Sequence, residues 1–309
     1  MKISPKLIKT NIIYKDDCIK SMLSLPEKSI DICVTSPPYN LNINYNTYKD
    51  NKSREEYLDW INEFTIALKH SLKDDGHFWF NVGYSNKDPW IGMDVAQIVR
   101  KHFKLQNNFI WVKSISINDV TTGHFKPINS ERYSNTTWEH LFHFTKDGNV
   151  KCDKVSVGVP FMYDCNIDQS SRIKGKIVKK MGFKNQKDFG KNSTDIQKKE
   201  AENELSIRTL NKKERGNKRD KGNSWYVPYD TISNKSQKGS HPAIFPIKLV
   251  EDCISFSNLK ENSILIDPFI GSGTSAIAAI NKKLKYIGYD IDSNYIEFAN
   301  QRISEHIKK

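Results

Sequence analysis

Two stretches of this chain alternate strand-like and helix-like hydrophobic patterns, and this alternation limits the fold more than any other feature of the sequence. The first has strand patterns at 11–14, 31–34, 77–82 and 138–145, and a helix from the capping-box pair Ser53 and Glu56 to Asp75-Gly76. The second has strand patterns at 264–266 and 286–291, and helices at 275–282 and 293–307. Strands that alternate with helices pair in parallel and are covered on both faces. The sequence therefore predicts an α/β fold built on a parallel sheet.

A strongly basic segment separates these two stretches. Residues 171–221 contain 17 Lys and Arg against 7 Asp and Glu, a net charge of +10 in a chain whose total is +12. The segment has few periodic apolar residues and many Lys, Asn, Gln and Ser, which predicts an inserted, partly flexible region. Such a cluster of cations favours a polyanionic partner, although any single lysine in it is more simply a solvated surface charge.

Composition excludes several other classes of protein. At 37% apolar and 11% aromatic residues, the chain can bury a core, which rules out wholesale disorder. Its five cysteines form no C-x-x-C pair and are odd in number, which argues against a disulfide framework. The longest apolar tract, 264–280, is too short for a membrane span and contains Asp267, and residues 1–11 do not form a signal peptide. We expect a cytoplasmic protein that does not bind membranes.

One loop of the second stretch has the composition of a ligand-binding turn. Asp267-Pro-Phe-Ile-Gly-Ser-Gly-Thr274 follows a strand and opens a helix, and its glycines let a ligand approach the backbone. One strand later stands Asp290, where a carboxylate can accept hydrogen bonds from ribose hydroxyls. The loop lacks the lysine of a phosphate loop and the third glycine of a dinucleotide fingerprint. It therefore indicates another nucleoside-containing cofactor, with a merely structural turn as the alternative.

A second loop, Thr35-Ser-Pro-Pro-Tyr-Asn40, ends a strand of the first stretch. Its two prolines fix the backbone and remove two N–H donors, so nearby carbonyl groups stay free to accept hydrogen bonds. With the Ser36 hydroxyl, these carbonyls suit an exocyclic amino group, and Tyr39 offers a flat face to a base taken out of its helix. Taken by itself, the loop fits a plain turn with a packed tyrosine equally well.

Together, the two loops resemble those of the DNA amino-methyltransferases, which methylate an exocyclic nitrogen of adenine or cytosine. In that family a Ser/Asp-Pro-Pro-Tyr/Phe loop holds the target base, and a Phe-x-Gly-x-Gly loop, here 269–273, binds S-adenosyl-L-methionine. The order of catalytic loop, basic insert and cofactor loop is similar to that of the β class in type II restriction-modification systems. The resemblance implies a Rossmann-like S-adenosylmethionine-dependent methyltransferase fold with a circularly permuted motif order and an inserted target-recognition region.

The resemblance also assigns regions and residues. It implies a catalytic half at 1–146, a target-recognition region at 147–236 and a cofactor-binding half at 237–309. The residues it assigns to catalysis are Ser36, Pro37, Pro38 and Tyr39. Those it assigns to the cofactor are Asp17 (a better match than Asp16), His241, Asp267, Phe269, Gly271, Gly273, Thr274 and Asp290. We expect no metal site, because His140 and His143 lie on an alternating strand with no second ligand pair nearby in the sequence.

The implied reaction is a direct, in-line methyl transfer to the amino nitrogen. Hydrogen-bond acceptors at Ser36 and Pro37 would favour a more tetrahedral nitrogen, and catalysis would come from positioning and from stabilising the developing positive charge. Ser36 is typical of cytosine-N4 enzymes, whereas the following Pro-Pro-Tyr-Asn is common among β-class adenine enzymes. We predict adenine-N6 methylation, with cytosine-N4 methylation as the alternative and an RNA methyltransferase or a non-catalytic nucleic-acid-binding protein as further ones.

The family resemblance implies partners as well. The substrate would be double-stranded DNA in a bacterium or phage, and a cognate restriction endonuclease would act on the same site. The basic insert would contact phosphates and read the sequence. The sequence leaves the choice between monomer and dimer open.

Overall fold

The computed structural model describes residues 8–43, 45–123, 127–160, 177–214, 218–229 and 245–308. The chain divides into two compact units, a larger one of residues 1–153 and 222–309 and a smaller one of residues 154–221. The smaller unit lies within the 147–236 region expected to recognise the target. None of the described helices combines the length and the apolar character needed to span a membrane.

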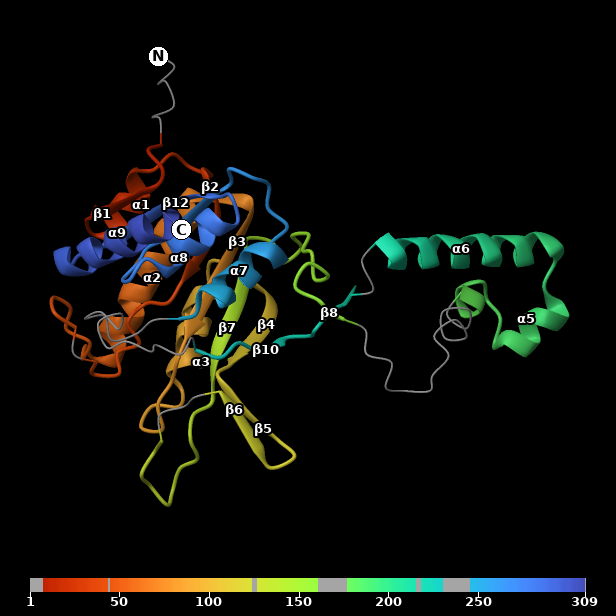
Figure 1. Cartoon of the computed structure of the whole chain (residues 1–309), viewed down its shortest axis with the longest axis horizontal. Coiled ribbons are helices and arrows are strands. Elements are labelled where there is room, and N and C mark those ends of the chain that lie inside the picture. The colour runs from red at the N-terminus through yellow and green to blue at the C-terminus, as the bar shows by residue number, and fades with distance from the viewer. Residues whose placement is uncertain are drawn as a thin grey trace, which may run out of the picture. The chain divides into compact units, whose positions relative to one another are not determined.

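The larger unit is built on one eight-stranded sheet (Figure 1). In order across the sheet its strands are β1 (Ile12–Lys15), β12 (Lys285–Asp290), β11 (Ile264–Asp267), β2 (Ile30–Thr35), β3 (Leu72–Val82), β7 (Trp138–Thr145), β4 (Lys104–Val112) and β10 (Ser224–Tyr226). All neighbours pair in parallel except β7, which is antiparallel to both β3 and β4. The predicted α/β fold is confirmed, and the prediction of an all-parallel sheet is wrong at one strand.

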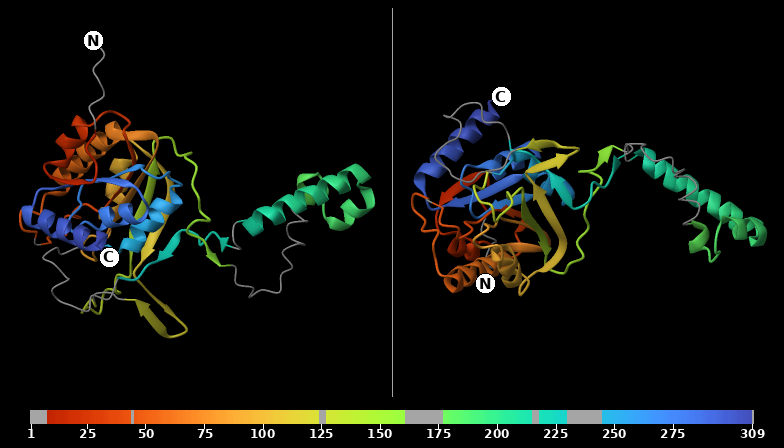
Figure 2. Two further views of the ribbon diagram at one scale, coloured as in Figure 1. Left: turned by 45° about the horizontal axis from the view of Figure 1, so that its top comes forward. Right: turned by 90° about the horizontal axis from the view of Figure 1, so that it is seen from below.

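Helices cover both faces of this sheet, as Figure 2 shows. One row comprises α1 (Cys18–Ser24), α2 (Arg54–Ser71) and α3 (Ile91–Val99), and the other comprises α7 (Ile247–Phe256), α8 (Thr274–Asn281) and α9 (Ser293–Ile307). Apolar side chains of the first row pack on β2, β3 and β7 to form the main core, in which Phe64, Phe78 and Phe80 are fully buried. This three-layer arrangement is the expected Rossmann-like methyltransferase fold.

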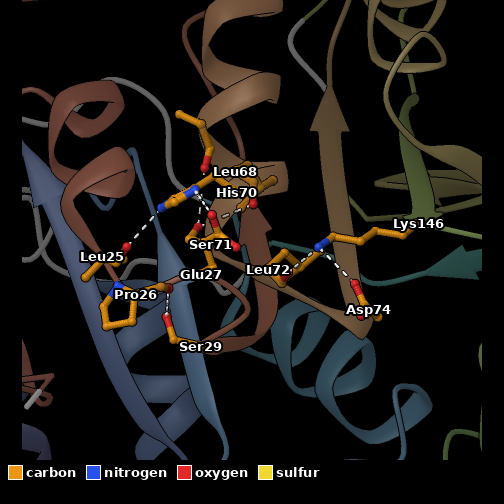
Figure 3. A network of polar contacts seen from close by, with 11 residues as sticks. Leu25, Pro26, Glu27, Ser29, Leu68, His70, Ser71, Leu72, Asp74 and Lys146 are labelled. Carbon is orange, nitrogen blue, oxygen red and sulfur yellow. Dashed lines mark hydrogen bonds and ion pairs between the residues drawn. The ribbon is translucent and has the colours of Figure 1, made fainter. Parts of the chain in front are cut away.

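Helix α2 begins where the sequence predicted but ends earlier. The Ser53 hydroxyl accepts from the Glu56 amide at 3.2 Å and the Glu56 carboxylate accepts from the Ser53 amide at 2.9 Å, which is a complete capping box. The helix ends at Ser71 rather than at Asp75-Gly76, which lies inside β3. Leu72 is fully buried and pairs with Ile30 of β2, so the backbone joins the sheet at that point. The Leu72 carbonyl also accepts from the Lys146 ammonium at 2.6 Å (Figure 3).

The strand order places a crevice between β11 and β2. These two strands are neighbours, with Leu265 opposite Ile32, but the chain leaves them in opposite directions: β11 continues through α8 to β12, and β2 continues through α2 to β3. In open α/β sheets, ligands bind at such a switch point, beyond the carboxyl ends of the strands. The loop after β2 comes early in the chain and the loop after β11 comes late. Because these two strands pair in parallel, both loops still lie at the same edge of the sheet.

The smaller unit has its own small core. Its described elements include β8 (Val159–Pro160), α5 (Gln186–Asn192), α6 (Asp195–Glu214) and β9 (Lys218–Arg219). Four buried residues, Ile177, Val178, Phe189 and Ala201, hold it together. Strands β8 and β9 pair with Val159 opposite Arg219, so the segments that enter and leave this unit lie side by side.

Candidate active site

The two predicted loops meet at the crevice and are joined directly. The Thr35 hydroxyl, at the end of β2, donates to the Asp267 carboxylate, at the end of β11, over 2.6 Å. Both side chains are about 1% exposed, so this hydrogen bond is shielded from water. A cavity of about 510 Å³ adjoins the two loops, and residues of both line its wall.

All four residues predicted to be catalytic line this cavity. The Ser36 and Tyr39 hydroxyls lie 2.5 Å apart. The Pro38 carbonyl accepts from the Tyr57 hydroxyl at 2.7 Å, whereas no donor in the described part of the chain reaches the Pro37 carbonyl. The sequence predicted that carbonyl groups near the two prolines stay free. Of the Pro37 and Pro38 carbonyls only that of Pro37 is free in the described part of the chain, because Tyr57 of α2 donates to that of Pro38.

Three further polar residues, Asn81, Lys113 and Glu139, complete the wall beside Tyr39. The Tyr39 hydroxyl lies 3.0 Å from the Asn81 side-chain oxygen and 3.3 Å from a Glu139 carboxylate oxygen. The other Glu139 oxygen accepts from the Lys113 ammonium at 2.8 Å, and both of these charged side chains are only 13% exposed. Burial raises the pKa of the Tyr39 hydroxyl well above its usual value, and the neighbouring Glu139 charge adds to this, so Tyr39 is neutral.

Sequence reasoning missed Glu139 because it assumed a parallel β7. In a parallel strand, Glu139 at its amino end would lie at the opposite edge of the sheet from the loops. In the antiparallel β7 it comes to the same edge as Asn81 at the end of β3 and Lys113 just after β4. The position of Lys113 at a strand end was visible in the sequence; its ion pair was not.

A single carboxylate, that of Asp50, holds the segment that follows the Pro-Pro motif. The Asp50 carboxylate accepts from the amides of Asn40, Leu41 and Ile43 at 2.8, 3.1 and 3.0 Å. Asp50 is 3% exposed, and burial raises its pKa despite these three donors. Tyr45 and Tyr48, further along this segment, line the same cavity.

On the opposite side of the cavity lies the glycine-rich loop. Gly271 donates its amide to the Asp290 carboxylate at 3.1 Å, and the other Asp290 oxygen accepts from the Asp292 amide at 2.8 Å. Burial raises the pKa of Asp290, and its side chain lines the cavity together with Gly271, Phe269 and Thr274. The Phe269 ring packs against Trp60 of α2, with centroids 5.3 Å apart.

Two of the residues predicted to bind the cofactor, Asp267 and Gly273, are not among the residues that line the cavity. Asp267 does not line the cavity; it accepts from Thr35, from the Ser275 hydroxyl at 2.5 Å and from the Phe269 amide at 3.1 Å. Its complete burial raises its pKa to about 6. Gly273 has φ +79° and begins α8, and a Cβ there would lie 3.0 Å from the Cβ of Ala299 on α9. Both residues support the shape of the loop.

The remaining predicted cofactor residues fall in two places. Asp17 lines the cavity and caps α1, where its carboxylate accepts from the amides of Ile19 and Lys20 at 3.1 and 3.0 Å. Its neighbour Asp16 lines the cavity as well. His241 lies outside the described residues.

The charge of the cavity wall suits a cationic ligand. Among the described lining residues, Asp16, Asp17, Glu139 and Asp290 are acidic and only Lys113 is basic, although the chain as a whole carries +12. Aromatic faces of Trp60, Tyr45 and Phe269 lie in the same wall and also favour cations. A nucleoside with a positively charged sulfonium group, the expected cofactor, fits both properties.

Comparison with known proteins agrees with this geometry. A family model described as DNA methylase, covering N6 and N4 enzymes, matches residues 30–301. The type II methyltransferase M.BglII of Bacillus subtilis is 27% identical over 302 residues, 95% of this chain and 69% of that protein. The orphan methyltransferase M.BamHII of Bacillus amyloliquefaciens is 30% identical over 295 residues, 90% of each chain.

Two solved structures share the fold. The cytosine-N4-specific PvuII DNA methyltransferase superposes with a TM-score of 0.61 at 18% identity, over 96% of this chain and 90% of that one. The M1.HpyAVI–SAM complex superposes with a TM-score of 0.51 at 18% identity, over 94% and 98%. The loops, the cavity between them and the match over residues 30–301 lead to one conclusion: the chain belongs to the N6/N4 DNA methylase family, the DNA amino-methyltransferases of type II restriction-modification.

Proposed function

We propose that this chain transfers a methyl group from S-adenosyl-L-methionine to the N6 amino group of adenine at a specific site in double-stranded DNA. The observation that supports this most is the Thr35–Asp267 hydrogen bond, which holds the Ser-Pro-Pro-Tyr loop and the glycine-rich loop on one cavity. A methyl donor and an acceptor base bound to these two loops would lie side by side, which is the main requirement of a direct transfer.

The cofactor-binding side of the cavity has the residues that the donor needs. In this proposal Asp290 accepts from the ribose hydroxyls, Asp17 contacts the adenine, and Phe269, Gly271 and Thr274 line the path between them; all five line the cavity. When bound, S-adenosyl-L-methionine supplies the sulfonium methyl group. Asp267 and Gly273 act beneath the loop, and His241 stays a prediction from the resemblance.

On the catalytic side, four acceptor and aromatic groups act on the base. The Pro37 carbonyl and the Ser36 hydroxyl accept hydrogen bonds from the amino group, which localises the lone pair of its nitrogen. Tyr39 stacks on the flipped base. The Glu139 carboxylate, close to the Tyr39 hydroxyl, stabilises the positive charge that develops on the amino nitrogen. The proton then leaves to solvent, because the serine is a poor base at neutral pH.

Cytosine-N4 methylation is the second candidate. A serine at the first position of the loop favours it, and the PvuII enzyme with the same fold is cytosine-N4-specific. The acceptors at Ser36 and Pro37 suit the amino group of either base, so we retain adenine for the Pro-Pro-Tyr-Asn sequence that follows Ser36.

The smaller unit and its flanks, 147–236, would recognise the target sequence. Lysines and arginines of 171–221 would neutralise DNA phosphates. The type II relatives favour a partner endonuclease that acts on the same site. One relative, M.BamHII, is named an orphan methyltransferase instead of a type II methyltransferase.

One incubation tests the proposal. The purified protein is mixed with unmethylated genomic DNA and S-adenosyl-L-methionine, and the DNA is digested to nucleosides for mass spectrometry. N6-methyladenine is the expected product. N4-methylcytosine would replace the first candidate by the second, and no methylated nucleoside would contradict both. Tyr39→Ala, prepared in parallel, controls for contaminating methylases.

A further inference from the structure

A two-stranded hairpin of the larger unit leaves an apolar strip uncovered. Strands β5 (Ser114–Ile117) and β6 (Val120–Gly123) pair with Ile115 opposite Thr122 and Ile117 opposite Val120. Because paired residues share a face and alternate along each strand, these four side chains lie on one face. Ile115, Ile117 and Val120 are 40%, 61% and 65% exposed. Figure 1 shows the hairpin projecting beyond the main sheet.

The hairpin is rigidly built, unlike a loose surface loop. Its two-residue turn, Asn118-Asp119, has φ values of +50° and +64°, as a type I′ turn requires. On its other face the Ser116 and Thr121 hydroxyls lie 2.6 Å apart, which joins the strands through their side chains. The tip therefore keeps Ile117 and Val120 together in an extended position.

The base of the hairpin is fixed to the rim of the active-site cavity. The amides of Lys113 and Ser114 both donate to the Thr137 carbonyl, at 2.7 and 3.3 Å. Gly123, at φ +93°, lies so close that a Cβ would meet the Lys113 carbonyl oxygen at 2.2 Å. The Lys113 ammonium is in turn bonded to Glu139 in the cavity wall. Both ends of the segment 113–139 thus lie at the cavity.

A DNA duplex is the partner that this position favours. A base that enters the cavity comes from a duplex lying across its mouth, so a rigid ribbon on the rim faces the same duplex. Two-stranded ribbons fit the DNA major groove, and proteins that bind the minor groove insert apolar side chains as wedges between base steps. The ribbon 114–123 has no Lys or Arg and one acid, Asp119, so it is not a phosphate-binding element.

We propose that the β5–β6 hairpin is a duplex wedge, in which Ile117 and Val120 enter the base stack beside the target and stabilise its extrahelical state. The proposal rests on the double-stranded DNA substrate of the proposed function and adds a residue pair outside the cavity. Removing the wedge should slow transfer only where the target base is paired, because an unpaired base needs no help to leave the stack.

The test compares Ile117→Ser/Val120→Ser with the matched control Ile307→Ser, which removes an equally exposed side chain (65%) from α9. The target site is first read from the methylated genomic DNA. Single-turnover methylation is then measured on a fully paired duplex and on one with an abasic site opposite the target base. We expect the double variant to be roughly tenfold slower on the paired duplex and within about twofold of wild type on the abasic one, a rescue that misfolding would not give.

Further outcomes decide between explanations. The dependence of DNA affinity on salt should keep its slope, because no phosphate contact is lost. The wedge would be overturned if the double variant methylated paired DNA at the wild-type rate. It would also be overturned if the double variant were slowed by the same factor on the paired and on the abasic duplex. A change from dimer to monomer in sedimentation would overturn it as well, and would assign the strip to a second copy of the chain. A wild-type protein that methylates no DNA would overturn the proposed function, and the wedge with it.

Discussion

Tyr39 shows how single residues define this site. Its hydroxyl lies within hydrogen-bonding distance of Ser36, Asn81 and Glu139, so the orientation of its ring is set by its own loop and by strands β3 and β7. Its ring also fits only because residue 83 is glycine: a Cβ there would lie 2.6 Å from the Tyr39 Cε2 atom. A tyrosine in a common turn motif thus becomes a rigid face in the cavity wall.

Tyr39→Ala should abolish most methyl transfer while leaving the cofactor bound. Base–aromatic stacking is worth roughly 1–3 kcal/mol, so we expect a loss of about 10- to 100-fold in single-turnover rate. Affinity for S-adenosyl-L-methionine, measured by calorimetry, should stay within about twofold because Asp290 and the glycine-rich loop are untouched. The control Tyr39→Phe keeps the ring and removes only the hydroxyl. Unchanged methyl transfer in Tyr39→Ala would disprove the stacking role.

Asp290→Ala should instead weaken the binding of S-adenosyl-L-methionine. Hydrogen bonds to a charged group contribute roughly 1.5–3 kcal/mol, so the dissociation constant should rise by about 10- to 100-fold in equilibrium dialysis. Asp292→Ala is the matched control, because Asp292 is two residues away, caps α9 through the Asn294 amide at 2.8 Å and does not line the cavity. It should lower stability and keep cofactor affinity. Equal affinity losses in both variants would mean that Asp290 acts only through the fold.

At the scale of elements, the antiparallel pairing of β7 with β3 matters most. It brings His143 beside His77, with ring nitrogens 2.9 Å apart and rings stacked at 5.2 Å. The Asn107 amide nitrogen lies 2.9 Å from the second His143 nitrogen, so a continuous hydrogen-bonded row crosses three strands. Burial lowers the pKa of His77 to about 4 and that of His143 well below its usual value, so both rings are neutral.

This buried pair predicts that the protein loses stability in mild acid. Below about pH 6.5 the unfolded chain binds protons at both histidines and the folded chain does not, so the free energy of unfolding falls as pH decreases from 7 towards 4. At pH 5 the loss from His77 should be about 2 kcal/mol, and His143 acts in the same direction. Asp267, whose folded pKa is about 6, opposes this trend because it gains a proton in the folded state first.

The comparison with variants isolates the histidine contribution. Urea unfolding of wild type and of His77→Asn/His143→Asn at pH 7.5 and 5.0 gives the change in stability for each. The difference between the two pH values should shrink in the double variant and stay as in wild type in the control His306→Gln. An unaltered pH dependence in the double variant would show that other groups cause it.

Over the whole molecule, charge and chemistry are divided between two regions. Residues 171–221 carry +10, which leaves +2 for the remaining 258 residues, and the cavity wall is acidic. A neutral to acidic cavity is needed for a cationic cofactor, and a basic region for a polyanion. Placing the basic region in a separate unit with its own small core satisfies both.

Excision of the smaller unit should therefore separate the two activities. Because β8 and β9 pair, a short Gly-Ser linker can join Asp153 to Gly222. The shortened protein should keep cofactor affinity and lose DNA affinity, with a shallower dependence of log K on log salt. A full-length control with Lys179, Lys180, Lys184, Lys187 and Lys191 changed to Gln should lose up to about 0.9 in slope for each phosphate contact removed. Unchanged DNA binding by the shortened protein would place recognition in the larger unit.

Local sequence by itself determined most of the elements and both ligand loops. The strands at 138–145 and the helix at 293–307 have the predicted bounds, because hydrophobic period and capping residues act over a few positions. The composition of the Ser36–Tyr39 and Phe269–Gly273 loops was sufficient to identify the family. The end of α2 was misplaced, because a buried Leu72 in the sheet overrides the turn signal of Asp75-Gly76.

Only the tertiary structure decided which residues face the cavity. The direction of β7 is set by its neighbours β3 and β4, which lie far away in the chain, and no local pattern encodes it. That direction places Glu139 beside Tyr39. The contacts of Asp267 with Thr35 and of Gly273 with Ala299 likewise come from distant segments, and the cofactor contact predicted for both residues stays a prediction. Loop identity is local, whereas the partners of each side chain depend on which distant segments pack against it.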